Sequence, residues 1–197
     1  MDNNIERAVN AELMPGETLL RSGQPNSSRL FTATDWFLVP FSLAGGAFGI
    51  WFVLSVLSTH LIFILFAAFY IPMVLYMVVG RFFAKTYSKK RTVYAVTDKR
   101  VMRLTLGRSG LKKKGMSSNL TGIEKESVSR GRAGCGSLYF GAVPFYAKLL
   151  MNTGMEYMPG YHVYDGLIFF DVDNVAQVLE IYKKARSAGQ RKNGDAS

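Results

Sequence analysis

Cationic side chains form the densest cluster of chemically useful groups in this 197-residue chain. Four of them stand between Gly107 and Gly115 and two more flank Gly131; together they are Arg108, Lys112, Lys113, Lys114, Arg130 and Arg132. Ammonium and guanidinium groups bind phosphate oxygens, and backbone amides near glycines can add donors. We interpret the six residues as a candidate contact for lipid head groups. The alternatives are a solvated run of charge and, for Arg130 and Arg132, simple turn residues.

The groups that enzymes most often use are scarce. The chain has two histidines, His60 and His162, and one cysteine, Cys135. A metal site of spaced His and Cys ligands needs more of them, and Cys135 is better explained as a small residue beside a strand than as a nucleophile. Asp171 and Asp173 are explained as helix caps. We therefore expect a protein that is not an enzyme, with no catalytic residue, no metal and no cofactor.

A long apolar stretch sets the organisation of the chain. Residues 36–80 contain no Asp, Glu, Lys or Arg. As a helix at about 1.5 Å per residue they would extend roughly 67 Å, about twice the ~30 Å hydrocarbon core of a bilayer. The stretch therefore predicts a transmembrane hairpin with spans at 36–58 and 61–80, joined by a polar turn.

Gly45 and Gly49 lie four residues apart in the first predicted span and form a small-residue face. Such a face permits close packing of helices in membranes. It serves either the approach of the two helices of the hairpin, which we favour, or a contact with another membrane helix.

The distribution of charge predicts the orientation of the hairpin. Its turn carries no Lys or Arg, whereas residues 81–91 carry five and residues 1–35 carry three. By the positive-inside rule both termini of this multi-pass protein are expected to be cytoplasmic. Residues 81–197 have a net charge of +12, which favours anionic phospholipids as partners. Nucleic acid is not expected, because the positive-inside rule already accounts for this excess.

Patterns typical of β-strands dominate after the hairpin, with a helix at the end. The strands are expected at 92–97, 100–106, 120–129, 137–141 and 166–170, and the helix ends near residue 189. Residues 142–164 have no clear period and predict a loop, whereas residues 2–13 predict a short amphipathic helix. The predicted domains are an N-terminal cytoplasmic segment (1–35), the hairpin (36–80), a cytoplasmic β-rich domain (81–189) and a disordered tail (190–197).

Several motifs of this β-rich part resemble a known family. They are YxxTDKRV at 94–101, GxGSLxFG at 134–141 and FFDVDxV at 169–175, with PGE at 15–17 and SGQP at 22–25 ahead of the hairpin. Their order resembles the bacterial pleckstrin-homology-like (PH-like) domains of the membrane-tethered type. Arg21 departs from the pattern, because many such chains have an aromatic residue there, and the 142–164 segment is longer than usual.

The resemblance implies an α+β fold in which a partly open antiparallel β-barrel is capped by a C-terminal α-helix. It also implies a non-enzymatic binding or scaffold protein of a bacterial inner membrane. Its domain is expected to contact anionic lipid, an unidentified protein partner, or both. The alternative function is that of a structural or accessory subunit of a larger membrane complex, with the hairpin as its main contact.

Overall fold

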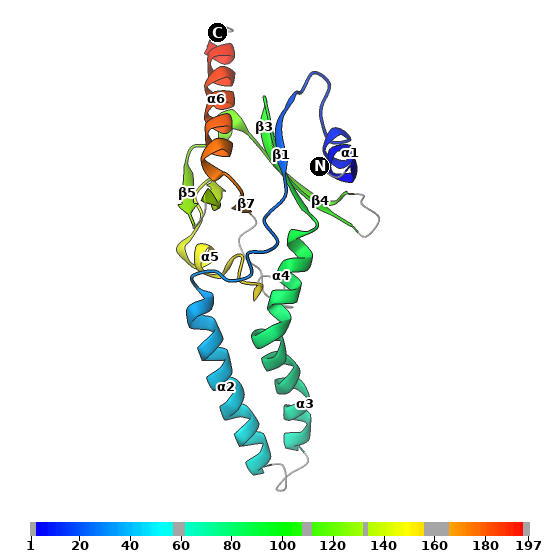
Figure 1. Cartoon of the computed structure of the whole chain (residues 1–197), viewed down its shortest axis with the longest axis vertical. Helices are drawn as coiled ribbons and strands as arrows, with labels where there is room; N and C mark the ends of the chain where they lie inside the picture. The colour runs from blue at the N-terminus through cyan, green and yellow to red at the C-terminus, as the bar shows by residue number, and fades with distance from the viewer. Residues whose placement is uncertain (1–2, 57–61, 108–111, 132–133, 156–165, 195–197) are drawn as a thin grey trace. The chain divides into compact units, whose positions relative to one another are not determined.

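The computed structural model describes residues 3–56, 62–107, 112–131, 134–155 and 166–194, without the side chains of the residues next to several of these gaps. The chain divides into two compact units (Figure 1). The β unit comprises residues 1–28, 87–144 and 164–197, and the hairpin unit comprises residues 29–86 and 145–163. The N-terminal segment is thus divided between the two units, and part of the predicted 142–164 loop belongs with the hairpin.

Two apolar helices that run side by side dominate the hairpin unit (Figure 1). They are α2 (Asp35–Val56) and α3 (Ile62–Leu75). A π-helical turn η1 (Tyr76–Gly80) continues α3 directly into α4 (Arg81–Lys89). By length and composition two helical stretches could cross a membrane, Asp35–Ser55 in α2 and Ile64–Lys89, which runs through α3, η1 and α4. They overlap the two predicted spans. The helix continues past the predicted end at residue 80, because α4 contains no helix breaker.

The β unit contains two antiparallel sheets. The first has the order β1 (Leu19–Gly23), β2 (Thr92–Thr97), β3 (Arg100–Leu106) and β4 (Lys112–Asn119), and the second has the order β5 (Glu126–Arg130), β6 (Gly136–Phe140) and β7 (Leu167–Val172). Strand β1 precedes the apolar hairpin in the sequence and β2 follows it. The two strands nevertheless pair, with Ser22 opposite Ala95 and Gly23 opposite Tyr94.

Both faces of the first sheet are covered. On the inner face, β2 and β3 pack with the second sheet and with α6 (Val175–Gly194) around Tyr94, Leu138, Phe169 and Tyr182. On the outer face, Val93, Ala95, Met102 and Leu104 lie under Ile5 and Val9 of α1 (Asn3–Asn10). All six residues of β2 are therefore buried. Each large apolar side chain removed from water contributes about 1.5–3 kcal/mol to folding.

The α+β class, the 92–97 and 100–106 strands and the N-terminal helix were predicted correctly. The partly open barrel that was predicted is not confirmed: among the described residues the strands form two antiparallel sheets, and no pairing joins them. Only the second half of the strand expected at 120–129 is a strand, as β5, whereas residues 120–122 form a 3-10 turn, η2 (Leu120–Gly122), with Leu120 buried in the core. The predicted loop contains α5 (Phe145–Leu150), and α6 continues to Gly194.

Candidate functional site

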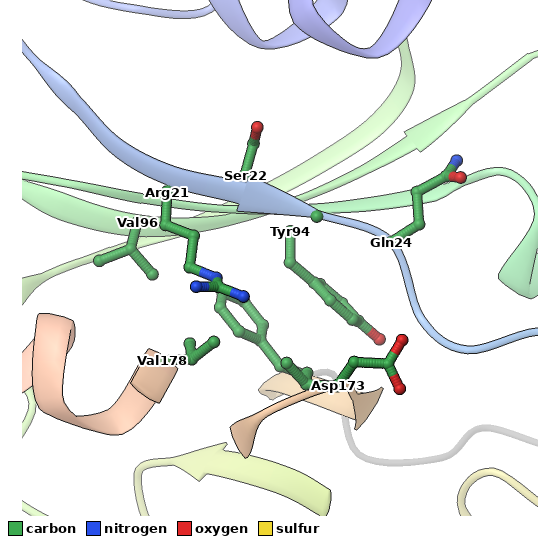
Figure 2. Close-up of a pocket in the computed structure, with 10 residues that line it drawn as sticks. Arg21, Ser22, Gln24, Tyr94, Val96, Asp173 and Val178 are labelled. Atoms are coloured by element: carbon green, nitrogen blue, oxygen red, sulfur yellow. The ribbon is translucent and has the colours of Figure 1, made fainter. Parts of the chain in front are cut away.

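A pocket of about 200 Å³ opens between β1, β7 and the start of α6 (Figure 2). It lies where the edge strand β1 of one sheet and the edge strand β7 of the other are not hydrogen-bonded together. Its wall combines apolar and polar side chains: Val96, Phe169, Val172 and Val178 on one hand, and Arg21, Gln24, Tyr94 and Asp173 on the other. An apolar wall with a few polar groups is typical of a small-ligand site.

Arg21 provides the positive charge of this pocket. A β-bulge between Leu19 and Arg21 shifts the register of β1, and such a bulge redirects the side chains that follow it. The Arg21 side chain extends from β1 toward α6 (Figure 2), where its Nη1 donates a hydrogen bond to Gln177 Oε1 at 2.6 Å. This acceptor is neutral, and no carboxylate among the described residues pairs with Arg21. A guanidinium without a counter-charge suits a carboxylate or phosphate group.

The other polar groups of the pocket have structural partners. The Tyr94 hydroxyl accepts the Phe170 N–H at 2.8 Å. Asp173 Oδ1 accepts a hydrogen bond from Asn26 Nδ2 at 3.0 Å and from Cys135 Sγ at 2.9 Å. Asp173 therefore ties the segment before the hairpin to the start of β6.

Asp171 is buried with a positive φ of 46°. It forms an ion pair with Lys89 at 2.5 Å, and its N–H donates to Ser137 Oγ at 3.3 Å. Burial and the negative charge of Asp171 raise the pKa of the Tyr139 phenol, so Tyr139 remains protonated at neutral pH. The residue before α6 is Asn174, whose carbonyl accepts hydrogen bonds from the N–H groups of Gln177 and Val178 in the first turn. The interpretation of Asp171 and Asp173 as helix caps thus misses their tertiary partners.

The predicted basic cluster is distributed over two sheets. Lys112, Lys113 and Lys114 belong to the edge strand β4, and Lys114 is exposed. Arg130 is exposed at the end of β5. Lysines on an edge strand also discourage pairing with another chain, which is a structural reason for their presence. Arg108 and Arg132 lie outside the described residues, as do His60 and His162.

The cations that follow the second span have partners within the chain. Arg81, Lys85 and Lys89 are spaced by four along α4, and each is at least 95% buried. Arg81 pairs with Asp35, and the Lys85 ammonium donates to the Leu30 carbonyl at 2.7 Å. These side chains therefore contribute less to the charge facing the surroundings than the sequence indicates.

The small-residue face of α2 is used within the hairpin. A Cβ atom at Gly49 would lie 1.9 Å from the Tyr70 ring, and one at Gly46 would lie 2.8 Å from Val74. The Tyr70 hydroxyl donates to the Gly45 carbonyl at 2.7 Å. A Cβ atom at Gly45, however, would meet nothing within 4 Å. The two glycines predicted to pack helices therefore differ. The α-carbon of Gly49 packs against Tyr70 of α3, whereas Gly45 contacts α3 only through its carbonyl and its α-carbon faces open space.

Glu17 anchors the segment before the hairpin to the turn between β2 and β3. Its carboxylate accepts hydrogen bonds from Arg100 Nε at 2.9 Å and Nη2 at 3.0 Å, from the Thr97 hydroxyl at 2.7 Å and from the Met14 N–H at 2.8 Å. Burial would raise the pKa of Glu17, but these hydrogen bonds and the charge of Arg100 outweigh it and lower the pKa. The TDKR motif thus has a structural role.

No protein-family model, curated protein or solved structure matches this chain. Its class therefore rests on its own fold, an α+β protein with two helices of membrane-spanning length and a two-sheet β unit. Within the described residues, no group of three His, Cys, Asp or Glu side chains could hold a metal ion. We take the Arg21 pocket as the candidate site, because it combines an apolar wall with a guanidinium. Arg21 was singled out in the sequence only as a departure from the family pattern.

Proposed function

We propose that this protein is a multi-pass protein of a bacterial inner membrane that carries a non-enzymatic, PH-like binding module on the cytoplasmic side. The observation that carries the proposal is the pairing of β1 with β2 across the apolar hairpin. Two strands can share a sheet only in one compartment, so a hairpin inserted in a membrane returns to the side from which it started. This supports two spans with both termini on the same side.

Two further features support the same proposal. The four-stranded and three-stranded sheets, followed by the C-terminal helix α6, agree with what the PH-like resemblance implies. The apolar helices carry large side chains exposed on their outer surfaces, such as Trp36 at 88% and Phe69 at 80%. Such surface is unfavourable in water and favourable in lipid.

The topology can be tested with single cysteines in a Cys135→Ala background. We choose Glu6→Cys in α1, Gln190→Cys in α6 and Thr59→Cys in the predicted turn. In spheroplasts of a bacterial host, a membrane-impermeant maleimide should label Thr59→Cys only, and permeabilisation should expose the other two. Labelling of Glu6→Cys or Gln190→Cys in intact spheroplasts would contradict the proposed orientation.

The binding role belongs to the Arg21 pocket and to β4. Arg21 suits an anionic group of a partner, and the lysines of β4 suit anionic lipid, at about 1 kcal/mol for each cation near the surface. In nanodiscs, the amides of β4 should exchange hydrogen more slowly with anionic than with zwitterionic lipid. Charge reversal at Lys112, Lys113 and Lys114 should remove that difference, whereas Lys183→Glu on α6 serves as the control. Exchange that is independent of lipid charge would contradict the lipid contact.

The full chain is needed for these experiments. A fragment that begins at residue 81 would lack α1, which covers the outer face of the first sheet, and β1, which forms the edge of that sheet and one wall of the pocket.

A second candidate function is that of a subunit whose hairpin contacts another membrane protein. The open space at the Gly45 α-carbon favours it, because a foreign helix could approach there. Gly45→Leu should then abolish co-purification of a partner while the thermal unfolding of the protein is unchanged. Co-purification that survives Gly45→Leu would exclude this contact.

A further inference from the structure

The short helix α5 exposes an apolar surface. Phe145, Tyr146 and Leu149 are 79%, 59% and 44% exposed, whereas Ala147 on the opposite side is buried. Three large neighbouring side chains that face outward from one six-residue helix are unusual for a surface in water. The described part of the chain provides no cover for them.

The segment after α5 fixes this helix to the hairpin. The Thr153 carbonyl accepts a hydrogen bond from Arg81 Nη1 at 3.2 Å, and the Gly154 carbonyl accepts one from the Tyr76 hydroxyl at 2.7 Å. Thr153 is completely buried. Gly154 has a φ of +89°, and a Cβ atom there would lie 2.3 Å from the Arg81 carbonyl oxygen. Only glycine therefore fits this close approach.

The segment after α5 contacts the hairpin at Arg81, at the end of its charge-free stretch. Arg81 and its partner Asp35 are the charged residues that bound the 45-residue stretch without charge. In the proposed membrane topology they lie where the hydrocarbon core ends. Trp36 and Phe37 are strongly exposed beside Asp35, and aromatic side chains concentrate at this level of a bilayer.

We propose that α5 is an interfacial helix, with Phe145, Tyr146 and Leu149 inserted between the head groups and the upper acyl chains of the leaflet in which the hairpin ends. Helix α5 belongs to the same compact unit as the hairpin, and the hydrogen bonds of Thr153 and Gly154 hold the segment after it beside Arg81 and Tyr76. The phenol of Tyr146 suits the polar part of this boundary and the other two side chains suit the apolar part. The proposal rests on the membrane insertion proposed above.

Quenching of tryptophan by brominated lipids tests both proposals separately. In a Trp36→Phe, Trp51→Phe background, Phe69→Trp reports on the middle of α3 and Phe145→Trp reports on α5. The full chain is reconstituted in vesicles whose lipids carry bromine either near the head group or near the bilayer centre. Phe69→Trp should lose most emission to the central bromines, and Phe145→Trp should lose most to the bromines near the head group.

The outcomes distinguish the two ideas. If Phe69→Trp is quenched and Phe145→Trp is not quenched by either lipid, the interfacial helix is wrong and the membrane hairpin stands. If neither is quenched, the hairpin itself is wrong. Adding Leu149→Asp to the Phe145→Trp variant should reduce its quenching without a change in thermal unfolding, because Leu149 is exposed. Quenching unchanged by Leu149→Asp would overturn insertion of α5.

Discussion

The β unit buries most of its large apolar side chains, whereas the hairpin unit leaves many of them exposed. In the β unit, α1 and α6 cover the two faces of the first sheet, so that β2 is completely buried. In the hairpin unit, α2 and α3 leave large aromatic side chains such as Trp36 and Phe69 exposed. The difference shows that the β unit covers its own apolar surface, whereas the hairpin unit leaves apolar surface exposed, which is the surface that the proposed membrane insertion would cover.

The two units share one electrostatic feature, an ion pair between an arginine and a buried carboxylate. Among the described residues, each unit contains such an Arg–carboxylate pair that joins distant parts of the chain, namely Asp35–Arg81 in the hairpin unit and Glu17–Arg100 in the β unit. Removing two charges from water is costly, so such pairs add little net stability by themselves. The pairs do favour the correct association of the two segments. Any other association would leave one charged partner buried without its counter-charge.

The largest effect is expected from breaking the pair in the hairpin unit. Arg81→Met removes the cation and leaves the Asp35 carboxylate buried, at a cost of about 3–5 kcal/mol. The melting temperature of the helices in detergent, followed by circular dichroism, should fall strongly. The exposed Glu180–Lys184 pair on α6 provides the control, and Glu180→Gln should leave the melting curve unchanged. Equal effects of the two variants would contradict a structural role for the buried pair.

A smaller effect is expected at the pair in the β unit, where Glu17→Gln keeps the shape and removes the charge. The loss of hydrogen bonds to a charged acceptor costs about 1.5–3 kcal/mol. Because the pKa of Glu17 is lowered by folding, its contribution is present above its ordinary value of 4.5 and is lost as the pH falls through the lower folded value. The stability of the wild type should therefore decrease in acid more steeply than that of Glu17→Gln. Parallel pH profiles from chemical denaturation would refute this.

Two glycine substitutions sharpen the distinction between packed and exposed surface within the hairpin. Gly49→Ala places a methyl group against the Tyr70 ring and should cost about 1–3 kcal/mol. Gly45→Ala meets open space and should be neutral or slightly stabilising, because alanine is the better helix former. Thermal unfolding in detergent measures both. A larger loss at Gly45 than at Gly49 would show that the hairpin packs differently.

The smallest effect on stability is expected at the pocket. Arg21→Gln removes one hydrogen bond to a neutral acceptor, which costs about 0.5–1.5 kcal/mol. Inorganic phosphate should raise the melting temperature of the wild type and should not raise that of Arg21→Gln. Lys183→Gln on α6 is the matched control and should retain the wild-type response. An identical phosphate response in all three proteins would exclude Arg21 as the anion contact.

Local patterns made much of the fold predictable. The charge-free stretch predicted the two apolar helices, and alternating β-branched residues around Asp98 predicted the hairpin of β2 and β3. The 142–164 region could not be assigned in the same way. A helix as short as α5 has little periodicity, and its position depends on Arg81 and Tyr76, which lie far away in the sequence.

The candidate site was less predictable than the fold. Clustering in the sequence pointed to the lysines at 112–114, which form part of an edge strand. Arg21 stands alone in the sequence, and it acquires a pocket only because β1 pairs with β2 and faces β7 and α6. No local pattern contains these partners.

The sequence by itself determined where the chain is apolar, where it is charged and, for most segments, whether they are helices or strands, because these properties depend on neighbouring residues. Only the tertiary structure decided which charges are buried. Arg81, Lys85 and Lys89 resemble a free cationic segment in the sequence, yet each finds an acceptor on another part of the chain. The physical reason is desolvation: a cation is stable in the interior only where folding brings a partner to it.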